Sequence, residues 1–199
     1  MPLTTSVMPE LGIRAPDFHL TDVVSGRRLE LSSFESKDAL LVMFVACHCP
    51  FSGYVRHELA HLASDYADRS LGIVAICASD VAQHPEDGPE GLRNFARQLN
   101  SPFPVCHDET QAVARAFQAA CTPDFFLFDG DRKLAYRGRL DDSRPGNPPP
   151  VVTGKDLRKA IDAVLAGRMV DGPQQPSMGC NIKWKPGNEP LYYAAGRPA

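Results

Sequence analysis

The run Cys47-His48-Cys49-Pro50 has the clearest chemical potential in the sequence, and it follows a continuous apolar stretch. Proline favours the first position of a helix, so a helix beginning at Pro50 would place Cys49 at its N-cap. The sulfur would then face unpaired backbone N–H groups and the positive end of the helix dipole, which both stabilise a thiolate. His48 can add positive charge beside it. The pattern predicts that Cys49 is a nucleophilic thiol.

Thiol chemistry of this kind needs a second thiol, and Ser52 stands where a Cys-x-x-Cys motif would place one. Because a serine cannot resolve a mixed disulfide, the partner must come from elsewhere in the chain or from another molecule. Cys121, in the run Cys121-Thr122-Pro123, is the best internal candidate. A proline that enters a strand after a short polar residue is either held cis in a tight turn or an ordinary trans proline.

The remaining cysteines have weaker signals. Cys77 and Cys106 end apolar runs and are expected to be packing residues. Periodicity does not explain Cys180, which is either a third redox thiol or part of a tail that only covers the sheet. Cys47, His48 and Cys49 are potential metal ligands, alone or with Cys180, but no second pair completes a tetrahedral set. We therefore expect no metal and no cofactor.

A second motif, His57-Glu58-Leu59-Ala60-His61, reads as H-E-x-x-H on a predicted helix. In zinc proteases this spacing supplies two metal ligands and a general base, and a third ligand is required. Ser64 and Ala67 stand where the longer metzincin motif has Gly and His. Because the motif also lies beside the apolar stripe of its helix, we interpret it as part of a solvated helix flank.

The surrounding pattern predicts the elements that position Cys49. Residues 39–47 form an apolar run typical of a doubly covered central strand, and apolar positions recur at helical spacing from 50 to 68. The other predicted elements are a hairpin over 16–34, a strand over 71–78, helices over 90–99, 111–117 and 155–165, and a hairpin over 124–140. Strand, helix and strand in alternation indicate a βαβ unit with a parallel pair. A proline-rich loop follows at 141–150.

Length and charge limit the classes of function. With 199 residues, of which 43% are hydrophobic, the chain can bury one core but hardly two. A formal net charge of -3 provides no general attraction for nucleic acid or anionic membranes. We expect an N-terminal arm over 1–11, one domain over 12–167 and a tail over 168–199. The N-terminus has neither the basic nor the apolar region of a secretion signal, so a cytoplasmic location with free or redox-active thiols is expected.

Several segments of the sequence resemble those of a known family. ALLVMFVACHCPFS followed by a helix, with TPDFFLFD downstream, is similar to the thioredoxin superfamily, and APDFHL and LSSF resemble its alkyl hydroperoxide reductase and peroxiredoxin branch. More narrowly, HCPFSGYVRH, AQHPEDGPE, CTPDFFLFDGD, YRGRLDDSRPG and PSMGCNIKWKPGNEP resemble a peroxiredoxin-like group of bacterial thioredoxin-family proteins. The resemblance covers nearly all of residues 12–190. It implies an α/β thioredoxin fold, a mixed central sheet flanked by helices, with an N-terminal hairpin and an extended C-terminal tail.

The resemblance also assigns site residues. It implies that Cys49 is the attacking thiol, that Pro123 is a cis-proline lying against it, and that Cys121 is thereby near enough to act as the resolving thiol. The Thr122 backbone would contact substrate, with Pro50 and Ser52 completing the substrate-binding residues.

Two departures from the family patterns affect the expected reaction. Ala46 stands where peroxiredoxins carry the Thr or Ser that polarises peroxide, and Met43 stands where thioredoxins carry a buried acid. The sequence therefore lacks one residue of the peroxidase mechanism and one of the thioredoxin mechanism, and the loss argues more strongly against the peroxidase.

Three functions remain open. The first is a thiol-disulfide oxidoreductase that acts on a protein or small disulfide and is recycled by a cellular thiol reductant. The second is a thiol peroxidase with antioxidant activity, in which Cys49 becomes a sulfenic acid. The third is a non-enzymatic thioredoxin-fold binding module or redox sensor, because one fold hosts many functions. None of them has nucleic acid or a membrane as a partner.

Overall fold

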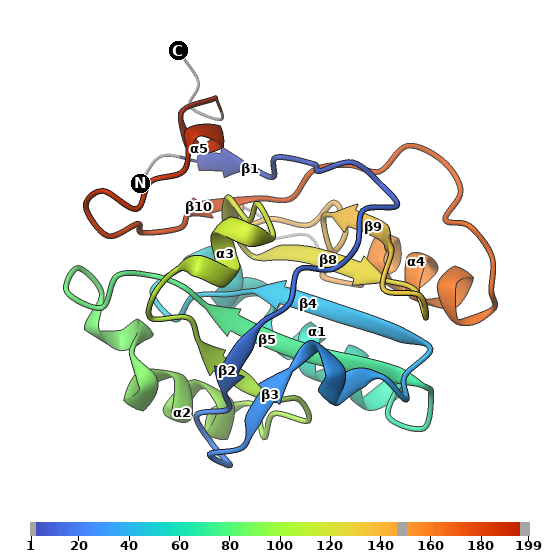
Figure 1. Ribbon diagram of the computed structural model, residues 1–199, viewed down its shortest axis with the longest axis horizontal. Coiled ribbons are helices and arrows are strands. Elements are labelled where there is room, and N and C mark those ends of the chain that lie inside the picture. The colour runs from blue at the N-terminus through green and yellow to red at the C-terminus, as the bar shows by residue number, and fades with distance from the viewer. Residues whose placement is uncertain (1–2, 147–150, 196–199) are drawn as a thin grey trace.

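The computed structural model describes residues 3–146 and 151–195, and its centre is a five-stranded mixed sheet (Figure 1). The strand order is β6-β5-β4-β8-β9. The strands are β4 (Ala39–Phe44), β5 (Leu71–Cys77), β6 (Val105–His107), β8 (Asp124–Phe128) and β9 (Leu134–Gly138). All six residues of β4 are buried, as expected for the continuous apolar run, and β4 pairs in parallel with β5 and antiparallel with β8.

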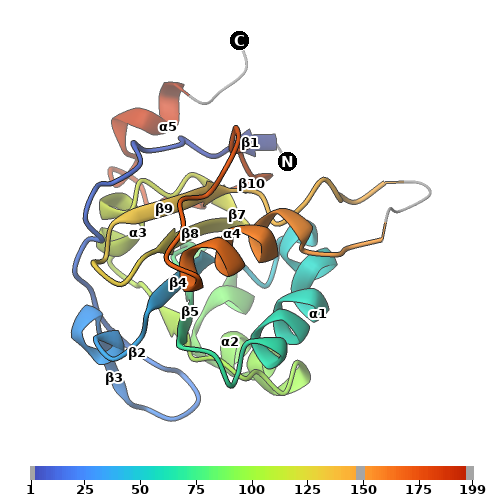
Figure 2. The same ribbon diagram turned by 90° about the vertical axis from the view of Figure 1, so that its right-hand side faces the viewer.

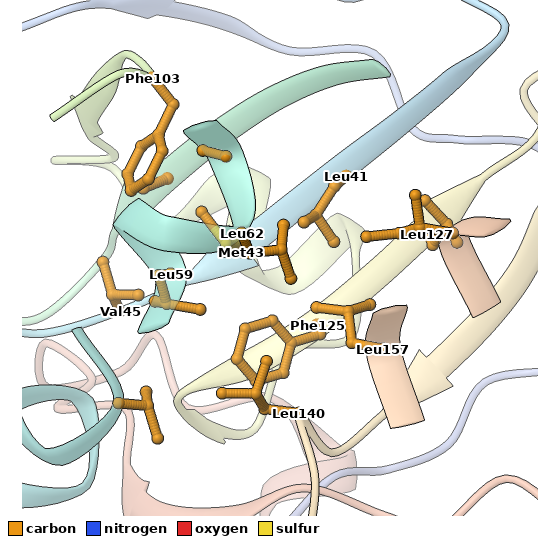
Figure 3. Packing of buried hydrophobic residues seen from close by; sticks show 14 of the residues in the cluster. Leu41, Met43, Val45, Leu59, Leu62, Phe103, Phe125, Leu127, Leu140 and Leu157 are labelled. Carbon is orange, nitrogen blue, oxygen red and sulfur yellow. The ribbon is translucent and has the colours of Figure 1, made fainter. Parts of the chain in front are cut away.

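Three helices provide the apolar side chains that cover one face of this sheet. They are α1 (Pro50–Asp65), α2 (Pro89–Gln98) and α4 (Lys155–Leu165). Their buried residues share one cluster with alternate strand residues such as Leu41 and Met43. Figure 3 shows Leu59 and Leu62 of α1 and Leu157 of α4 lying against Met43, Phe125 and Leu127 of the sheet. The helix bearing Cys49 at its start is thus fixed to the sheet along its length.

The opposite face is covered by an N-terminal hairpin and a short helix. β2 (His19–Thr21) and β3 (Arg28–Glu30) pair antiparallel, η1 (Leu31–Phe34) follows them, and α3 is Ala112–Ala116. Phe117 lies against Phe18, Phe44 and Phe126, with ring centroids 5.7–6.4 Å apart. Figure 2 shows the hairpin and α3 on one side of the central sheet and α1 and α4 on the other.

The two ends of the chain meet in a separate three-stranded sheet with the order β1-β10-β7. β1 (Leu3–Thr5) pairs antiparallel with β10 (Met178–Asn181), which pairs antiparallel with β7 (Cys121–Thr122). Figure 1 shows β1 and β10 running side by side above the central sheet, with α5 (Leu191–Ala195) beyond them. Both the arm and the tail expected from the sequence therefore contribute strands that pack on the rest of the molecule.

The observed elements confirm the predicted fold class, including the parallel β4–β5 pair and the β8–β9 hairpin at the sheet edge. The sequence analysis did not predict β1, β7 and β10, which are two to four residues long and cannot be identified by periodicity. Residues 1–2, 147–150 and 196–199 lie outside the described residues, and they include three prolines of the predicted proline-rich loop. Within the described ranges, the helices are all too short or too polar to cross a membrane.

Candidate thiol active site

Cys49 occupies the position predicted for it at the start of α1. It is the N-cap residue, with an extended backbone (φ -83°, ψ 117°), and Pro50 is the first helical residue. The side chain is only 1% exposed, because the strand end, the helix and the C-terminal segment surround it. An N-cap sulfur faces N–H groups that have no partner within the helix.

The groups around Cys49 on balance favour its thiolate form. One contact favours the thiol instead, because the Cys49 S–H donates a hydrogen bond to the Thr122 carbonyl oxygen at 3.1 Å. Burial is the largest single influence on the pKa of Cys49 and acts to raise it, but the nearby Thr122 side chain, the Cys180 thiol and the Ser52 and Cys180 N–H groups act to lower it and outweigh burial. The pKa of Cys49 is therefore lowered from its ordinary value of 9.0. The buried Thr122 hydroxyl has no hydrogen-bond partner among the described residues, so it is free to turn toward the thiolate.

The Thr122–Pro123 peptide bond is cis, which confirms the prediction from the family resemblance. This bond joins β7 to β8. In the β10–β7 pair, Cys180 lies directly opposite Thr122. Directly opposite residues of an antiparallel pair present their side chains to the same face, so Cys180 is presented to the side on which Thr122 contacts Cys49.

Cys180 and Lys183 make the C-terminal segment part of the site. Cys180 is 2% exposed, and burial together with its contact with Cys49 raises its pKa to about 12. Burial lowers the pKa of Lys183, whereas charge interactions with Cys180 and Cys49 act to raise it. Its ammonium group donates hydrogen bonds at 2.9 Å to the Asn181 backbone oxygen and to the Asn181 side-chain oxygen. A cation is thus held near both sulfurs and favours whichever one is ionised.

Cys121 lies close to this site but is oriented differently. Successive side chains of a strand point to opposite faces, so Cys121 is directed away from the face shared by Thr122 and Cys180. Its thiol lies 3.7 Å from the Pro123 carbonyl oxygen, and it also contacts Ser6. The Ser6 hydroxyl donates to Asp124 at 2.7 Å. Complete burial raises the pKa of Cys121 well above 9.0 and that of Asp124 to about 7.

Asp87 holds the other side of the β4–α1 turn. This carboxylate, from η2 (Pro85–Asp87), is fully buried and accepts hydrogen bonds from the Cys47 N–H at 2.6 Å and the His48 N–H at 3.2 Å. It also contacts the His48 ring at Nδ1, and that ring stacks on His84 with centroids 3.8 Å apart. Burial acts to raise the pKa of Asp87, but the contacts with His48 outweigh it and the pKa is lowered.

The predicted contribution of His48 to the Cys49 thiolate takes a different form. Its side chain is 3% exposed and is directed to Asp87, while the groups that lower the pKa of Cys49 are Thr122, Cys180 and Ser52. His48 and Asp87 therefore fix the backbone of the turn that presents Cys49.

The residues predicted to bind substrate divide into exposed and buried ones. Pro50 is exposed at the helix start, whereas the Ser52 hydroxyl is buried and accepts a hydrogen bond from the Ala46 N–H at 3.3 Å. Pro123 borders a hollow of about 120 Å³. The hollow is also lined by Phe51 and Tyr54 of α1, Asp141 and Asp142, and Met178 of β10. A surface depression thus lies beside the cis-proline and the first turn of α1.

The H-E-x-x-H run has a structural explanation in the contact between two helices. Glu58 accepts hydrogen bonds at 2.9 and 2.7 Å from Arg158 of α4, and the His61 side chain is 75% exposed. Within the described ranges, no group of three or more His, Cys, Asp or Glu side chains is arranged to hold a metal ion.

Sequence analysis did not assign roles in the site to Asp87 and Lys183, and it left Cys180 unexplained. Asp87 lies in the segment HPEDGPE and Cys180 in the segment MGCNIK, and both segments belong to the stretches that resemble the bacterial group. No spacing rule links either residue to the Cys49 turn, because the contacts depend on the fold. Asp87 and His48 are 39 positions apart along the chain, and Cys180 and Cys49 are 131 positions apart. The resemblance of these two segments to the bacterial group was the available indication that they contribute to the site.

Comparison with known proteins shows the fold and the family of the chain. Two solved structures, each with a TM-score of 0.90, align closely. One is an uncharacterised conserved protein from Geobacillus kaustophilus, with 51% identity over 94% of this chain and 98% of that one. The other is a hypothetical protein from Sinorhizobium meliloti 1021, with 47% identity over 92% of this chain and all of that one. The thioredoxin domain of a thiol-disulfide oxidoreductase from Bacteroides vulgatus is 18% identical, with a TM-score of 0.57 over 67% of this chain and 91% of that one, and shares the fold.

Among curated proteins, the thiol-disulfide oxidoreductase ResA of Bacillus thuringiensis subsp. konkukian is 28% identical over 127 residues, which is 63% of this chain and 67% of that one. The model of the AhpC/TSA family matches residues 11–137, which include the Cys49 turn and the cis-proline. The chain has a thioredoxin fold and belongs to the AhpC/TSA family.

Proposed function

We propose that the protein is a thiol-disulfide oxidoreductase in which Cys49 is the attacking thiol. The observation that carries this proposal is the environment of Cys49, a buried thiol at the N-cap of α1 whose pKa is lowered by neighbouring groups that include a second thiol, Cys180. Family membership supports it, as does the similarity to curated relatives named thiol-disulfide oxidoreductases.

The reaction begins when the Cys49 thiolate attacks one sulfur of a substrate disulfide. A mixed disulfide forms between Cys49 and that sulfur, and the other substrate sulfur leaves as a thiolate. A second protein thiol then attacks Cys49 and releases the remaining substrate thiol. The substrate gains two electrons, and a cellular dithiol reductant restores the two protein thiols. Disulfide-containing proteins and small disulfides are both substrates of this chemical class.

Pro123, Pro50 and the hollow beside them are the proposed docking surface for the substrate. The buried Pro123 lines the hollow together with Phe51 and Tyr54, and the exposed Pro50 begins the same first turn of α1. Thr122 is proposed to act on the reacting sulfur in both of its forms, because its carbonyl oxygen accepts a hydrogen bond from the Cys49 thiol and its hydroxyl can donate one to the thiolate.

Single-turnover reduction of a small disulfide, such as oxidised glutathione, tests this function. The reduced protein is expected to release two equivalents of glutathione, and the Cys49→Ser variant none. Unchanged release by the Cys49→Ser variant would contradict the proposal.

Stopped-flow oxidation by hydrogen peroxide separates disulfide exchange from the peroxidase alternative. Ala46 supplies no hydroxyl near the sulfur to polarise peroxide, so we expect peroxide to react much more slowly than the disulfide. A faster reaction with peroxide would favour the peroxidase. Failure of both oxidants to react would favour the binding module.

A further inference from the structure

We propose that Cys180, carried by β10, is the thiol that resolves the mixed disulfide on Cys49. This inference rests on the proposed function and changes one part of it, because the sequence analysis gave the resolving step to Cys121. It also gives the C-terminal segment a role in the chemistry.

The pairing of the strands provides the first argument. β10 lies along β7 with Cys180 opposite Thr122 and Asn181 opposite Cys121. Cys180 therefore shares a face with Thr122, whose carbonyl oxygen accepts the Cys49 proton at 3.1 Å, whereas Cys121 shares a face with Asn181. The Cys49 and Cys180 side chains belong to the same buried cluster, and the nearby Cys180 thiol and N–H act to lower the pKa of Cys49.

Gly179 provides a second, independent argument. A Cβ atom at this position would lie 2.0 Å from the Thr122 carbonyl oxygen and 2.8 Å from its carbonyl carbon. Only glycine allows β10 to approach the cis-proline turn so closely, which is a common reason for glycine within a strand. The sequence at this position thus permits the contact that brings the next residue, Cys180, to Cys49.

The charges around the pair set the order of the two steps. Cys49 lies at the N-cap of α1, and the contact between the two cysteines lowers the pKa of Cys49 and raises that of Cys180, so Cys49 ionises first and is the sulfur that attacks the substrate. Once Cys49 is in a mixed disulfide, its negative charge is gone. The Lys183 cation can then favour the thiolate of Cys180.

The resolving step conserves atoms and electrons. The Cys180 proton passes to solvent, and its sulfur attacks the Cys49 sulfur. A Cys49–Cys180 disulfide forms, the bond between Cys49 and the substrate breaks, and the substrate leaves as a thiolate that takes a proton from solvent. The two protein sulfurs are oxidised by two electrons and the substrate is reduced by two.

The tryptic peptides of this chain allow a direct test. Cys121 lies in peptide 116–132, Cys180 in peptide 169–183, and Cys49 in peptide 38–56 together with Cys47. Reduced full-length protein in a Cys47→Ser background is treated with oxidised glutathione, free thiols are blocked, and the digest is examined by mass spectrometry. We expect peptide 38–56 linked to peptide 169–183. A link between 38–56 and 116–132 would overturn the proposal.

Two matched variants add a kinetic readout. Cys180→Ser is expected to accumulate the Cys49–glutathione mixed disulfide and to slow release of the second glutathione by more than about 100-fold, because the intramolecular attack is lost. Cys121→Ser, also a buried cysteine of this three-stranded sheet, is expected to change that rate by less than about threefold, because it leaves the intramolecular pair intact.

The opposite ranking of these two variants would assign the step to Cys121 and overturn the proposal. Formation of a mixed disulfide that never resolves in the Cys47→Ser protein would also overturn it, while leaving Cys49 as the attacking thiol. If oxidised glutathione does not react with Cys49 at all, both the proposed function and this pairing fail.

Discussion

Cys47 and Cys49 lie two residues apart on one turn, yet the structure gives them opposite properties. Burial and the negative charges of Asp87 and Glu86 raise the pKa of Cys47 to about 12. The pKa of Cys49 is lowered, because Thr122, Cys180 and the N-terminal turn of α1 together favour its thiolate more than burial opposes it. The difference comes from what packs against each side of the turn: acidic η2 near Cys47, and the cis-proline and β10 near Cys49.

The largest expected effect separates the two thiols by substitution. Cys49→Ser should lower the turnover of a small disulfide by more than about 10³-fold, because the nucleophile is lost. Cys47→Ser is the matched control and should keep turnover within about threefold, because a thiol that is not ionised does not react. The rates are measured in a coupled assay with a dithiol reductant. Equal losses in both variants would show that the two sides of the turn are not chemically distinct.

The Asp87 side of the turn is expected to act through stability. Asp87→Asn removes the buried charge that accepts the Cys47 and His48 N–H groups and contacts the His48 ring, and it should lower the free energy of unfolding by about 3 kcal/mol. Urea denaturation measures this change. The neighbouring control, Glu86→Gln, alters a side chain that is 51% exposed and should stay within about 0.5 kcal/mol of the parent protein.

If Asp87→Asn instead left stability unchanged but removed activity, Asp87 would belong to the chemistry of the site rather than to the support of the turn.

On the Cys49 side, the approach of β10 is tested by Gly179→Ala. The added methyl group would clash with the Thr122 carbonyl, so we expect a loss of about 1–3 kcal/mol in the free energy of unfolding. Gly53→Ala is the control, because Gly53 lies in helix α1 and a Cβ atom added there would meet nothing within 4 Å. It should be neutral or stabilising by up to about 1 kcal/mol. Equal effects of both changes would remove the argument for a close strand approach.

Sequence reasoning predicted the framework of the fold because its main elements have strong local signals. The apolar run of β4 and the helical spacing of α1 identified a strand–turn–helix unit, and Pro50 located its N-cap. The same local pattern led to the prediction that Cys49 is a nucleophilic thiol. The cis bond at Pro123 was predicted only through the family resemblance.

The rest of the site depends on tertiary contacts that leave no periodic trace. β10 has four residues and β7 has two, so their pairing, which brings Cys180 to Thr122, could not be derived from hydrophobic spacing. Asp87 reaches the turn from a segment 38 to 40 residues away. The choice of Cys121 over Cys180 as partner reflects this, since Cys121 is adjacent in sequence to the cis-proline turn and Cys180 is adjacent only in space.

The most direct test of the central claim is the pH dependence of alkylation at each cysteine. Iodoacetamide reacts with thiolates, so each rate rises with pH through the pKa of its thiol and reports that pKa as a midpoint. Alkylation is followed by mass spectrometry in the Cys47→Ser and Cys49→Ser variants, so that the two sites are read separately. We predict a midpoint for Cys49 below 9.0 and one for Cys47 far above it. A midpoint for Cys49 at or above 9.0 would contradict the account.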